Sequence, residues 1–364
     1  MINRFIMTKV FSLIFICFIG LALVASRTYD YKRVSDISFP KTESFDTIQI
    51  TDGPYIFITS DSLIEKRIIK GKLETKTAAL QTMRSQFDNE SSTFTNASKI
   101  AALSDIHGQY DVAKTILKNN GIIDAEDNWA YGDGHFVIVG DIFDRGPNVT
   151  ELLWLIFKLE TQAEQAGGKV HYLLGNHEYM VMQNDLRYIN KKYRQTERIL
   201  RTHYDQLYSN ETVLGKWLRS KATILKIDNY LFVHAGISLN FIESGIDLEA
   251  TNQKMRQSLL EEQTETKWDS IYNKYYNSEG PIWYRGYFSE DFKKSQLKKI
   301  LKTLQVDHII VGHTSQKQIE SLFGNKIFAV DTSIKNGVSG ELLFIENGNF
   351  YRGTMDGQKI KIKK

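Results

Sequence analysis

Short apolar runs recur along the chain after residue 98, and five of them lead directly into residues that can bind a metal or a phosphate. The runs are rich in Val, Ile and Phe and have the length of β-strands. The residues that follow them are Asp105, His107, Asp141, Asn176, His177, His234 and His313. In layered α/β folds, ligands bind where loops leave the carboxyl ends of strands. The pattern therefore predicts a polar site at the edge of a buried sheet.

Amphipathic segments lie between these runs and predict helices. Residues 112–122 and 151–165 place apolar side chains at helical spacing, as expected for helices that cover a sheet. Two further segments, near residues 186–218 and 242–276, are rich in helix formers. We interpret them as helical insertions around the cleft.

Two late stretches are typical of β-hairpins. Residues 223–234 have Asp228-Asn229 at the expected turn, and residues 340–353 have Asn347-Gly348 there. Antiparallel hairpins combined with strand–helix alternation predict an α/β (α+β) fold, in which mixed sheets pack face to face as a β-sandwich flanked by helices. This predicted catalytic domain runs from residue 99 to 355.

Residues 27–98 differ from the rest of the chain. Alternating β-branched runs at 46–60 and 63–77 predict a small N-terminal β region, with turns at Asp52-Gly53 and Gly71. The stretch 88–98 is polar and without hydrophobic period, which is typical of a linker.

The first 26 residues have the features of a secretory signal. Arg4 and Lys9 precede an uncharged apolar run of 16 residues that ends at Ala25, and small residues there suit cleavage after Ser26. The run is shorter than the roughly 20 residues that a spanning helix needs. We expect export, most simply to a periplasm. The alternative is an uncleaved membrane anchor at residues 5–25, and a membrane is expected as a partner only in that case.

Composition excludes several classes of function. The only cysteine, Cys17, lies inside the apolar run, so a cleaved protein has no thiol chemistry. Removing residues 1–26 lowers the formal charge from +3 to +1, which does not indicate nucleic-acid binding. The chain has no GxxxxGK[ST] loop, no strand-coupled GxGxxG and no GxSxG elbow, which disfavours nucleotide-dependent enzymes and serine hydrolases.

The residues at the strand ends indicate a metal site only when they are considered together. Asp105 and His107 are two residues apart at a strand end, where both side chains reach the same edge, and they have the form of half a metal site. Taken singly, an Asp or His at a strand end is often a solvated loop residue, and Asn176 could be a turn former.

In order, the blocks DIHG, GDIFDRG, GNHE, HAG and GH resemble the calcineurin-like metallophosphoesterases of the phosphoprotein phosphatase family. The match spans about residues 99–340. The segment PIWYRGYF and the β region ahead of the catalytic part resemble more closely the bacterial Shewanella-like phosphatases, a group with cold-active protein-tyrosine phosphatase activity. The resemblance implies a metal-dependent phosphomonoesterase.

The resemblance also implies a dinuclear metal site. Asp105 and His107 would bind the first divalent ion, Asp141 would bridge both, and Asn176, His234 and His313 would complete the second. Two such ions activate water and neutralise the phosphoryl oxygens, and oxygen and nitrogen ligands suit Mn, Fe, Zn or Mg.

The remaining family residues concern phosphate and proton transfer. Arg145 and Arg285 match the phosphate-binding arginines, with Asn176 beside them, because a guanidinium can contact two phosphoryl oxygens. His177 matches the general acid, with Asp144 orienting and charging it. The implied substrate is a phosphorylated protein, with phosphotyrosine favoured by the resemblance.

Alternatives remain open at the level of sequence. A diadenosine tetraphosphatase or another small-molecule phosphoesterase shares these blocks, and a non-catalytic metal-binding scaffold is the alternative outside enzymes. An intact acid pair with both arginines disfavours the scaffold. Several other residues have an ordinary structural explanation: His135, His171, His203, His308, Asp331 and the lysine-rich segments.

Overall fold

The apolar runs after residue 98 form two six-stranded sheets in the computed structural model, which describes residues 49–245, 247–260 and 270–363. The predicted signal segment lies outside the described residues. None of the described helices is long and apolar enough to cross a membrane.

The first sheet has the strand order β15-β14-β13-β5-β6-β7. Strands β5, β6 and β7 are parallel, whereas β13, β14 and β15 pair antiparallel. The bounds are β5 Lys99–Leu103, β6 His135–Ile138, β7 Lys169–Tyr172, β13 Glu341–Glu346, β14 Asn349–Thr354 and β15 Lys359–Lys361. The β13–β14 pair confirms the second predicted hairpin, and both turn residues, Asn347 and Gly348, have positive φ.

The second sheet has the order β11-β12-β10-β9-β8-β4. Here β9, β10 and β12 are parallel, and β8 pairs antiparallel with β9 through the predicted Asp228-Asn229 turn. The bounds are β4 Thr93–Phe94, β8 Ile224–Ile227, β9 Tyr230–Val233, β10 His308–Val311, β11 Glu320–Leu322 and β12 Ile327–Ala329. Each sheet therefore contains three parallel strands whose carboxyl ends can present loops to one site.

Alternate residues of the central strands pack into two different cores. Val137 of β6 and Val139, which follows the strand, join Phe232 and Ile310 of the second sheet in a cluster between the sheets. The intervening Ile138 belongs instead to the cluster under the helices. This period of two is the signature of a strand that is buried on both faces. The two sheets form a sandwich, as predicted.

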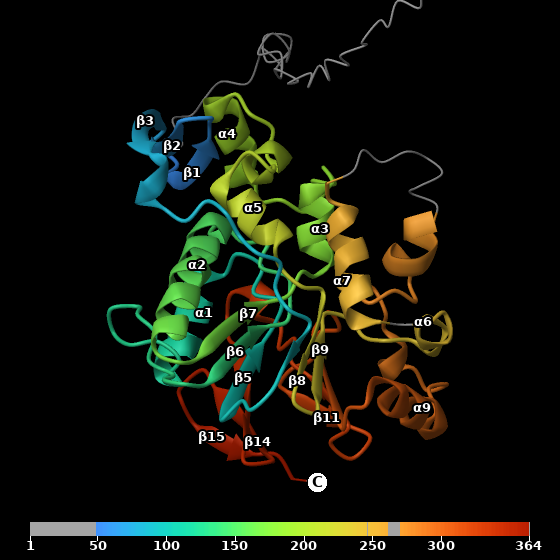
Figure 1. Ribbon diagram of the computed structural model, residues 1–364. Coiled ribbons are helices and arrows are strands. Elements are labelled where there is room, and N and C mark those ends of the chain that lie inside the picture. The colour runs from blue at the N-terminus through green and yellow to red at the C-terminus, as the bar shows by residue number, and fades with distance from the viewer. Residues whose placement is uncertain (1–48, 246, 261–269, 364) are drawn as a thin grey trace, which may run out of the picture. The chain divides into compact units, whose positions relative to one another are not determined.

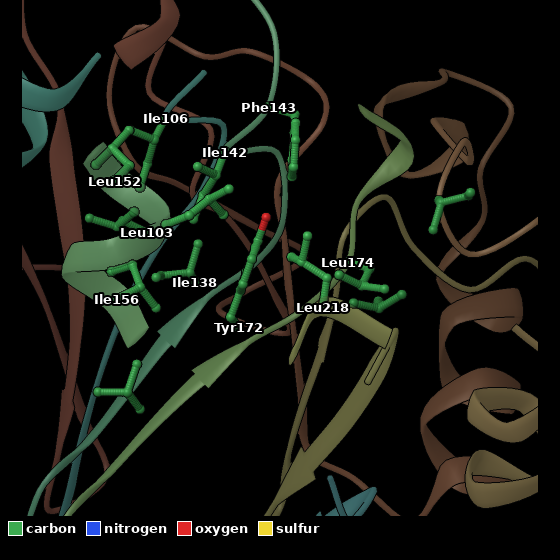
Figure 2. Close-up of a cluster of buried hydrophobic side chains, with 14 of the residues drawn as sticks. Leu103, Ile106, Ile138, Ile142, Phe143, Leu152, Ile156, Tyr172, Leu174 and Leu218 are labelled. Atoms are coloured by element: carbon green, nitrogen blue, oxygen red, sulfur yellow. The ribbon is translucent and has the colours of Figure 1, made fainter. Parts of the chain in front are cut away.

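Helices cover the outer faces of the sandwich. In Figure 2, Leu103 and Ile138 of the first sheet point toward Leu152 and Ile156 of α2. The helices are α1 Tyr110–Asn119, α2 Val149–Gln165, α3 Asn176–Met182, α4 Lys191–Leu200, α5 Val213–Arg219, α6 Leu239–Glu243, α7 Leu248–Gln257 and α9 Lys294–Leu304. Shorter helical turns are η2 Leu80–Thr82, η3 Asp205–Tyr208, η4 Tyr272–Tyr276, η5 Gly286–Phe288 and η6 Ile334–Asn336. Helices α1 and α2 occupy the segments predicted from helical spacing.

The predicted N-terminal β region is a three-stranded antiparallel sheet of β1 Asp52–Ile58, β2 Ser62–Ile69 and β3 Lys72–Ala79. It lies beside α4 and α5 (Figure 1). Asp52 accepts a hydrogen bond from the Thr196 hydroxyl of α4 at 2.6 Å, and the Trp154 indole of α2 donates to the Pro54 carbonyl at 2.8 Å. These polar contacts attach the small sheet to the helices that flank the larger sandwich.

The polar stretch 88–98, interpreted as a linker, is packed against the sandwich. Its strand β4 pairs with β8, and the Glu90 carboxylate lies 2.6 Å from Nδ1 of His171. Arg256 of α7 donates to the Glu90 carbonyl at 2.6 Å. A polar composition does not distinguish a free linker from a segment whose backbone pairs with a sheet edge, because the pairing uses main-chain groups.

Candidate metal centre

The candidate site residues come from the carboxyl ends of both sheets. Asp105 and His107 follow β5, Asp141 and Asp144 follow β6, and Asn176 and His177 begin α3 after β7, whereas His234 follows β9 and His313 follows β10. These eight residues are buried, none more than 5% exposed. The structure therefore brings together residues that are up to 208 positions apart along the chain, as in the hydrogen bond from the His313 N–H to Asp105.

Asp141 lies at the centre of the site. Its Oδ2 atom is 3.2 Å from Nε2 of His234, 3.6 Å from Nε2 of His107 and 4.0 Å from Nε2 of His177. Two groups of side chains could each hold a metal ion, namely His107 with Asp141 and His177, and Asp141 with His234 and His313. Asp141 belongs to both groups, as a bridging ligand must.

Backbone carbonyls orient two of the imidazoles toward Asp141. The Nδ1–H of His107 donates to the Phe143 carbonyl at 2.7 Å, and that of His234 donates to the Val139 carbonyl at 2.8 Å. With Nδ1 used in this way, the Nε2 lone pair of each ring remains available for a metal, which is the usual arrangement for histidine ligands. Nε2 of His234 also lies 2.9 Å from Oδ1 of Asn176.

The charges of the site fit a divalent cation. Burial lowers the pKa of His107 to about 3, and burial with the nearby His234 lowers that of His313 to about 2, so both rings are neutral, as metal ligands must be. Burial opposes protonation of His234, but the negative charge of Asp141 outweighs it and raises its pKa to about 10. Without a metal, His234 therefore carries a proton beside Asp141, and a cation bound at its Nε2 would replace that proton. Within the described residues, the buried Nε2 of His313 has no hydrogen-bond partner. Buried carboxylates and nitrogen donors without thiolates suit Mn, Fe, Zn or Mg.

Asp105 connects the ends of the two sheets. Its Oδ2 accepts from the Ser104 hydroxyl at 2.6 Å and from the His313 N–H at 2.9 Å, while Oδ1 lies 3.8 Å from Nε2 of His107. Burial, together with the negative charge of Asp331, raises the pKa of Asp105 well above its usual value. A cation beside Asp105 would relieve this cost of burying a carboxylate.

His177 forms a close pair with Asp144. Its Nδ1 atom lies 2.5 Å from Oδ2 of Asp144, which leaves Nε2 facing the side of Asp141 and His107. Burial lowers the pKa of His177, but the charge of Asp141 and the bond to Asp144 outweigh it, so the pKa is raised. The pair can therefore hold a proton near the centre of the site.

The two candidate arginines lie at the surface, unlike the other predicted residues. Arg285 donates to the His313 carbonyl at 2.8 Å and to the Thr314 hydroxyl at 3.0 Å. The guanidinium of Arg145 lies 5.5 Å from the centroid of the Tyr188 ring. Neither arginine is within 4 Å of a carboxylate in the described part of the chain, so both guanidinium groups can receive an anion.

Glu178 is a site residue that the sequence reasoning did not identify. This wholly buried carboxylate accepts the N–H groups of Asp141 at 2.9 Å, Ile142 at 2.7 Å and Gly175 at 2.7 Å, and also the Tyr172 hydroxyl at 2.8 Å. It thereby fixes the loop that carries Asp141 against the start of α3. Glu178 is the last residue of the GNHE block, but the sequence predicted roles only for its neighbours Asn176 and His177.

The backbone of the site is strained. Six candidate residues have positive φ, between 47° and 72°: Asp105, His107, Asp141, Asp144, Arg145 and His313. For non-glycine residues this conformation is costly and clusters at functional sites. Gly175 shows how closely the loops approach, since a Cβ there would lie 2.2 Å from Oδ1 of Asp141.

Comparisons with known proteins agree with this geometry. Residues 98–317 match the model of the calcineurin-like phosphoesterase family. Shewanella-like protein phosphatase 1 of Plasmodium berghei is 30% identical over 278 residues, which cover 72% of this chain and 73% of that protein. Shewanella-like protein phosphatase 2 of Arabidopsis thaliana is 25% identical over 68% of this chain and 74% of its own length.

A solved structure provides a further comparison. The crystal structure of the cold-active protein-tyrosine phosphatase of a psychrophilic Shewanella species is 40% identical to this chain, with a TM-score of 0.82. The match covers 86% of this chain and all of that one. The resemblance inferred from the motif blocks is confirmed. The chain belongs to the calcineurin-like phosphoesterase family and is a metal-dependent phosphoesterase.

Proposed function

We propose that the protein is a phosphomonoesterase with two divalent ions that acts on phosphorylated proteins. The observation that carries the proposal is the pair of buried side-chain groups that share Asp141. Asp105 and His107 would hold one ion with Asp141, and Asn176, His234 and His313 would hold the other. When bound, such ions supply a nucleophile from water and offset the negative charge of the phosphoryl group.

The chain's own residues would orient the phosphoester and supply a proton. Arg145 and Arg285 lie at the surface and have no carboxylate partner among the described residues, and each can donate two parallel hydrogen bonds to phosphoryl oxygens. Asn176 offers a further amide nitrogen, whose hydrogen-bond contact among the described residues is with the Met180 sulfur at 3.8 Å. These donors would place the ester oxygen near His177.

His177 would act as the general acid. Its raised pKa favours the protonated ring, and the bond to Asp144 holds the proton on Nδ1 while Nε2 faces the site. Donation from Nε2 to the departing oxygen would avoid release of an unstable alkoxide. Asp144 would keep the ring oriented and charged.

The relatives' names support a protein substrate. Those named here are called protein phosphatases, and the Shewanella structure is called a protein-tyrosine phosphatase. We infer that this chain hydrolyses phosphotyrosine in proteins, with phosphoserine and phosphothreonine as further candidates. Hydrolysis of small phosphoesters is the competing assignment.

We also propose that the protein is exported. The support is the apolar run behind Arg4 and Lys9, which ends in small residues before Arg27. The proposed division of the chain is a signal at 1–26, the small β region and connecting segment at 27–98, and a catalytic domain at 99–355.

Purified protein that lacks residues 1–26 tests the assignment. We expect hydrolysis of p-nitrophenyl phosphate that stops with a chelator and returns with Mn, Zn, Fe or Mg. A panel of peptides with one sequence, phosphorylated on Tyr, Ser or Thr, should show hydrolysis, whereas diadenosine tetraphosphate should not be preferred. Chelator-resistant activity, or activity on small phosphoesters alone, would contradict the proposal.

A further inference from the structure

Tyr188 is an exposed aromatic residue at the margin of the metal centre. It lies between α3 and α4 and is 45% exposed, although most large apolar side chains of the described residues are buried. Its ring centroid is 5.5 Å from that of His177, with the two planes at 52°. An aromatic surface therefore adjoins the residue assigned as the proton donor.

Main-chain contacts hold Tyr188 in this place. The N–H of Arg145 donates to the Tyr188 carbonyl at 3.0 Å, and the Asn190 side chain donates to the Arg145 carbonyl at 2.7 Å. These bonds join the loop after β6 to the segment before α4. The ring is thus positioned by its backbone and not by burial of its side chain.

Two cations flank the ring. The guanidinium groups of Arg145 and Arg187 lie 5.5 Å and 5.6 Å from its centroid, within cation–π range. Arg187 is itself paired with Asp185 at 2.6 Å, whereas Arg145 has no carboxylate within 4 Å among the described residues. Arg145 can therefore contact a phosphoryl group while its neighbour Tyr188 presents an aromatic surface.

The position of the proton donor determines which part of a bound phosphoester lies next to Tyr188. A phosphoester whose ester oxygen accepts a proton from His177 must carry its organic group next to that ring. Tyr188 is the exposed aromatic side chain in contact with His177. We propose that Tyr188 contacts the organic group on the ester oxygen and favours aryl phosphates, such as phosphotyrosine, over alkyl phosphates.

This inference rests on the proposed function and specifies its substrate. Offset or edge-to-face contacts between aromatic rings add affinity beyond the area that they bury. The expected discrimination in favour of an aromatic group is about two- to tenfold, the range that one such pair provides. Tyr188 would bias the site toward phosphotyrosine and would not exclude phosphoserine.

Tyr188 could instead serve only to position Arg145, and this alternative predicts a different result. If the ring only positioned the Arg145 guanidinium, its removal would weaken binding of every phosphoester equally, because all share the phosphoryl group. A contact with the organic group would instead change the ratio between aromatic and aliphatic ligands. The ratio is therefore the readout that separates the two roles.

The test uses inhibition by phenylphosphonate and methylphosphonate, which have no ester oxygen to be cleaved. We would measure both inhibition constants in the metal-loaded protein and in the variants Tyr188→Leu, Tyr188→Phe and Tyr351→Leu, the last on β14 of the first sheet. Tyr188→Leu should lower the preference for phenylphosphonate about two- to tenfold, and Tyr188→Phe should retain it. Tyr351→Leu should leave it unchanged. The same order is expected for kcat/KM on phosphotyrosine relative to phosphoserine peptides.

Two results would overturn the inference in distinguishable ways. If the unaltered protein is an active phosphatase but Tyr188→Leu weakens both phosphonates equally, Tyr188 positions Arg145 and does not select the organic group. If the unaltered protein hydrolyses no phosphomonoester with any of the four metals, the proposed function itself fails, and this inference fails with it.

Discussion

Nδ1 of His177 lies 2.5 Å from Oδ2 of Asp144, and both side chains are almost wholly buried. The opposite nitrogen of the same ring belongs to a group with His107 and Asp141 that could hold a metal ion. One nitrogen cannot donate a proton and bind a metal at the same time. The contribution of His177 is therefore open to a direct test.

His177→Asn should leave two metal ions bound and substrate affinity nearly intact, while kcat falls by about 10²–10⁴, the usual contribution of a positioned general acid. The defect should be larger for alkyl than for aryl phosphates, because an alkoxide needs protonation as the bond breaks and a nitrophenolate does not. Metal analysis and kinetics of the same preparation measure both quantities. Loss of metal in parallel with activity would instead make His177 a ligand.

Asp144→Asn should move the alkaline limit of activity to lower pH. In the proposed mechanism the protonated His177 ring is the active form, and the negative charge of Asp144 helps to raise its pKa. Without that charge the pKa of His177 falls, so the ring loses its proton at a lower pH and activity declines earlier as the pH rises. The measurement is kcat/KM against pH, with the exposed Asp133→Asn as the control. A profile identical to that of the unaltered protein would show that Asp144 does not tune the proton donor.

Much of the fold could be predicted from the sequence because local pattern and tertiary structure agree. The runs before Asp105, Asp141, His234 and His313 form strands, and both predicted hairpins have their turns at the expected residues. His171, expected to be structural, indeed contacts Glu90 and His135. A strand that is buried on both faces requires a continuous apolar run, and this is visible without knowledge of its neighbours.

Other features depend on contacts between distant segments and leave little trace in local sequence. Glu178 accepts hydrogen bonds from backbone N–H groups. Every residue except proline carries such a group, so the sequence does not show which residues Glu178 contacts. Tyr188 becomes a candidate site residue only because the fold places its segment against Arg145. The pairing of β4 with β8 likewise uses main-chain groups of a polar stretch.

Glu178→Gln should destabilise the fold as well as the site. An amide has one acceptor oxygen in place of two, so backbone N–H groups on one side of the carboxyl group would lose their partner inside the protein. Leaving buried donors unsatisfied should lower the free energy of unfolding by about 2–4 kcal/mol.

Urea unfolding at neutral pH measures this change, and Glu164→Gln is the matched control, because the Glu164 side chain is 53% exposed and its nearest cation is 3.7 Å away. Equal stability of the two variants would show that Glu178 does not hold the Asp141 loop.

Export predicts a defined amino terminus. In the native host, the mature protein should begin at Arg27 or within a few residues of it and should fractionate outside the cytoplasm. Sequencing of the purified amino terminus, combined with cell fractionation, measures both. A membrane-bound product that begins at Met1 would favour the anchor at residues 5–25, and a full-length form in the cytoplasmic fraction would contradict both versions.

The central claim is that one carboxylate, Asp141, bridges two metal ions, and counting those ions tests it most directly. Metal content and turnover should be measured on one sample each of the unaltered protein, Asp141→Asn and the control Asp133→Asn. We expect two ions per chain and full activity in the unaltered protein and the control. In Asp141→Asn, where a neutral amide replaces the shared charge, we expect fewer than two ions and no turnover above background. Two retained ions with full turnover in Asp141→Asn would contradict the dinuclear site.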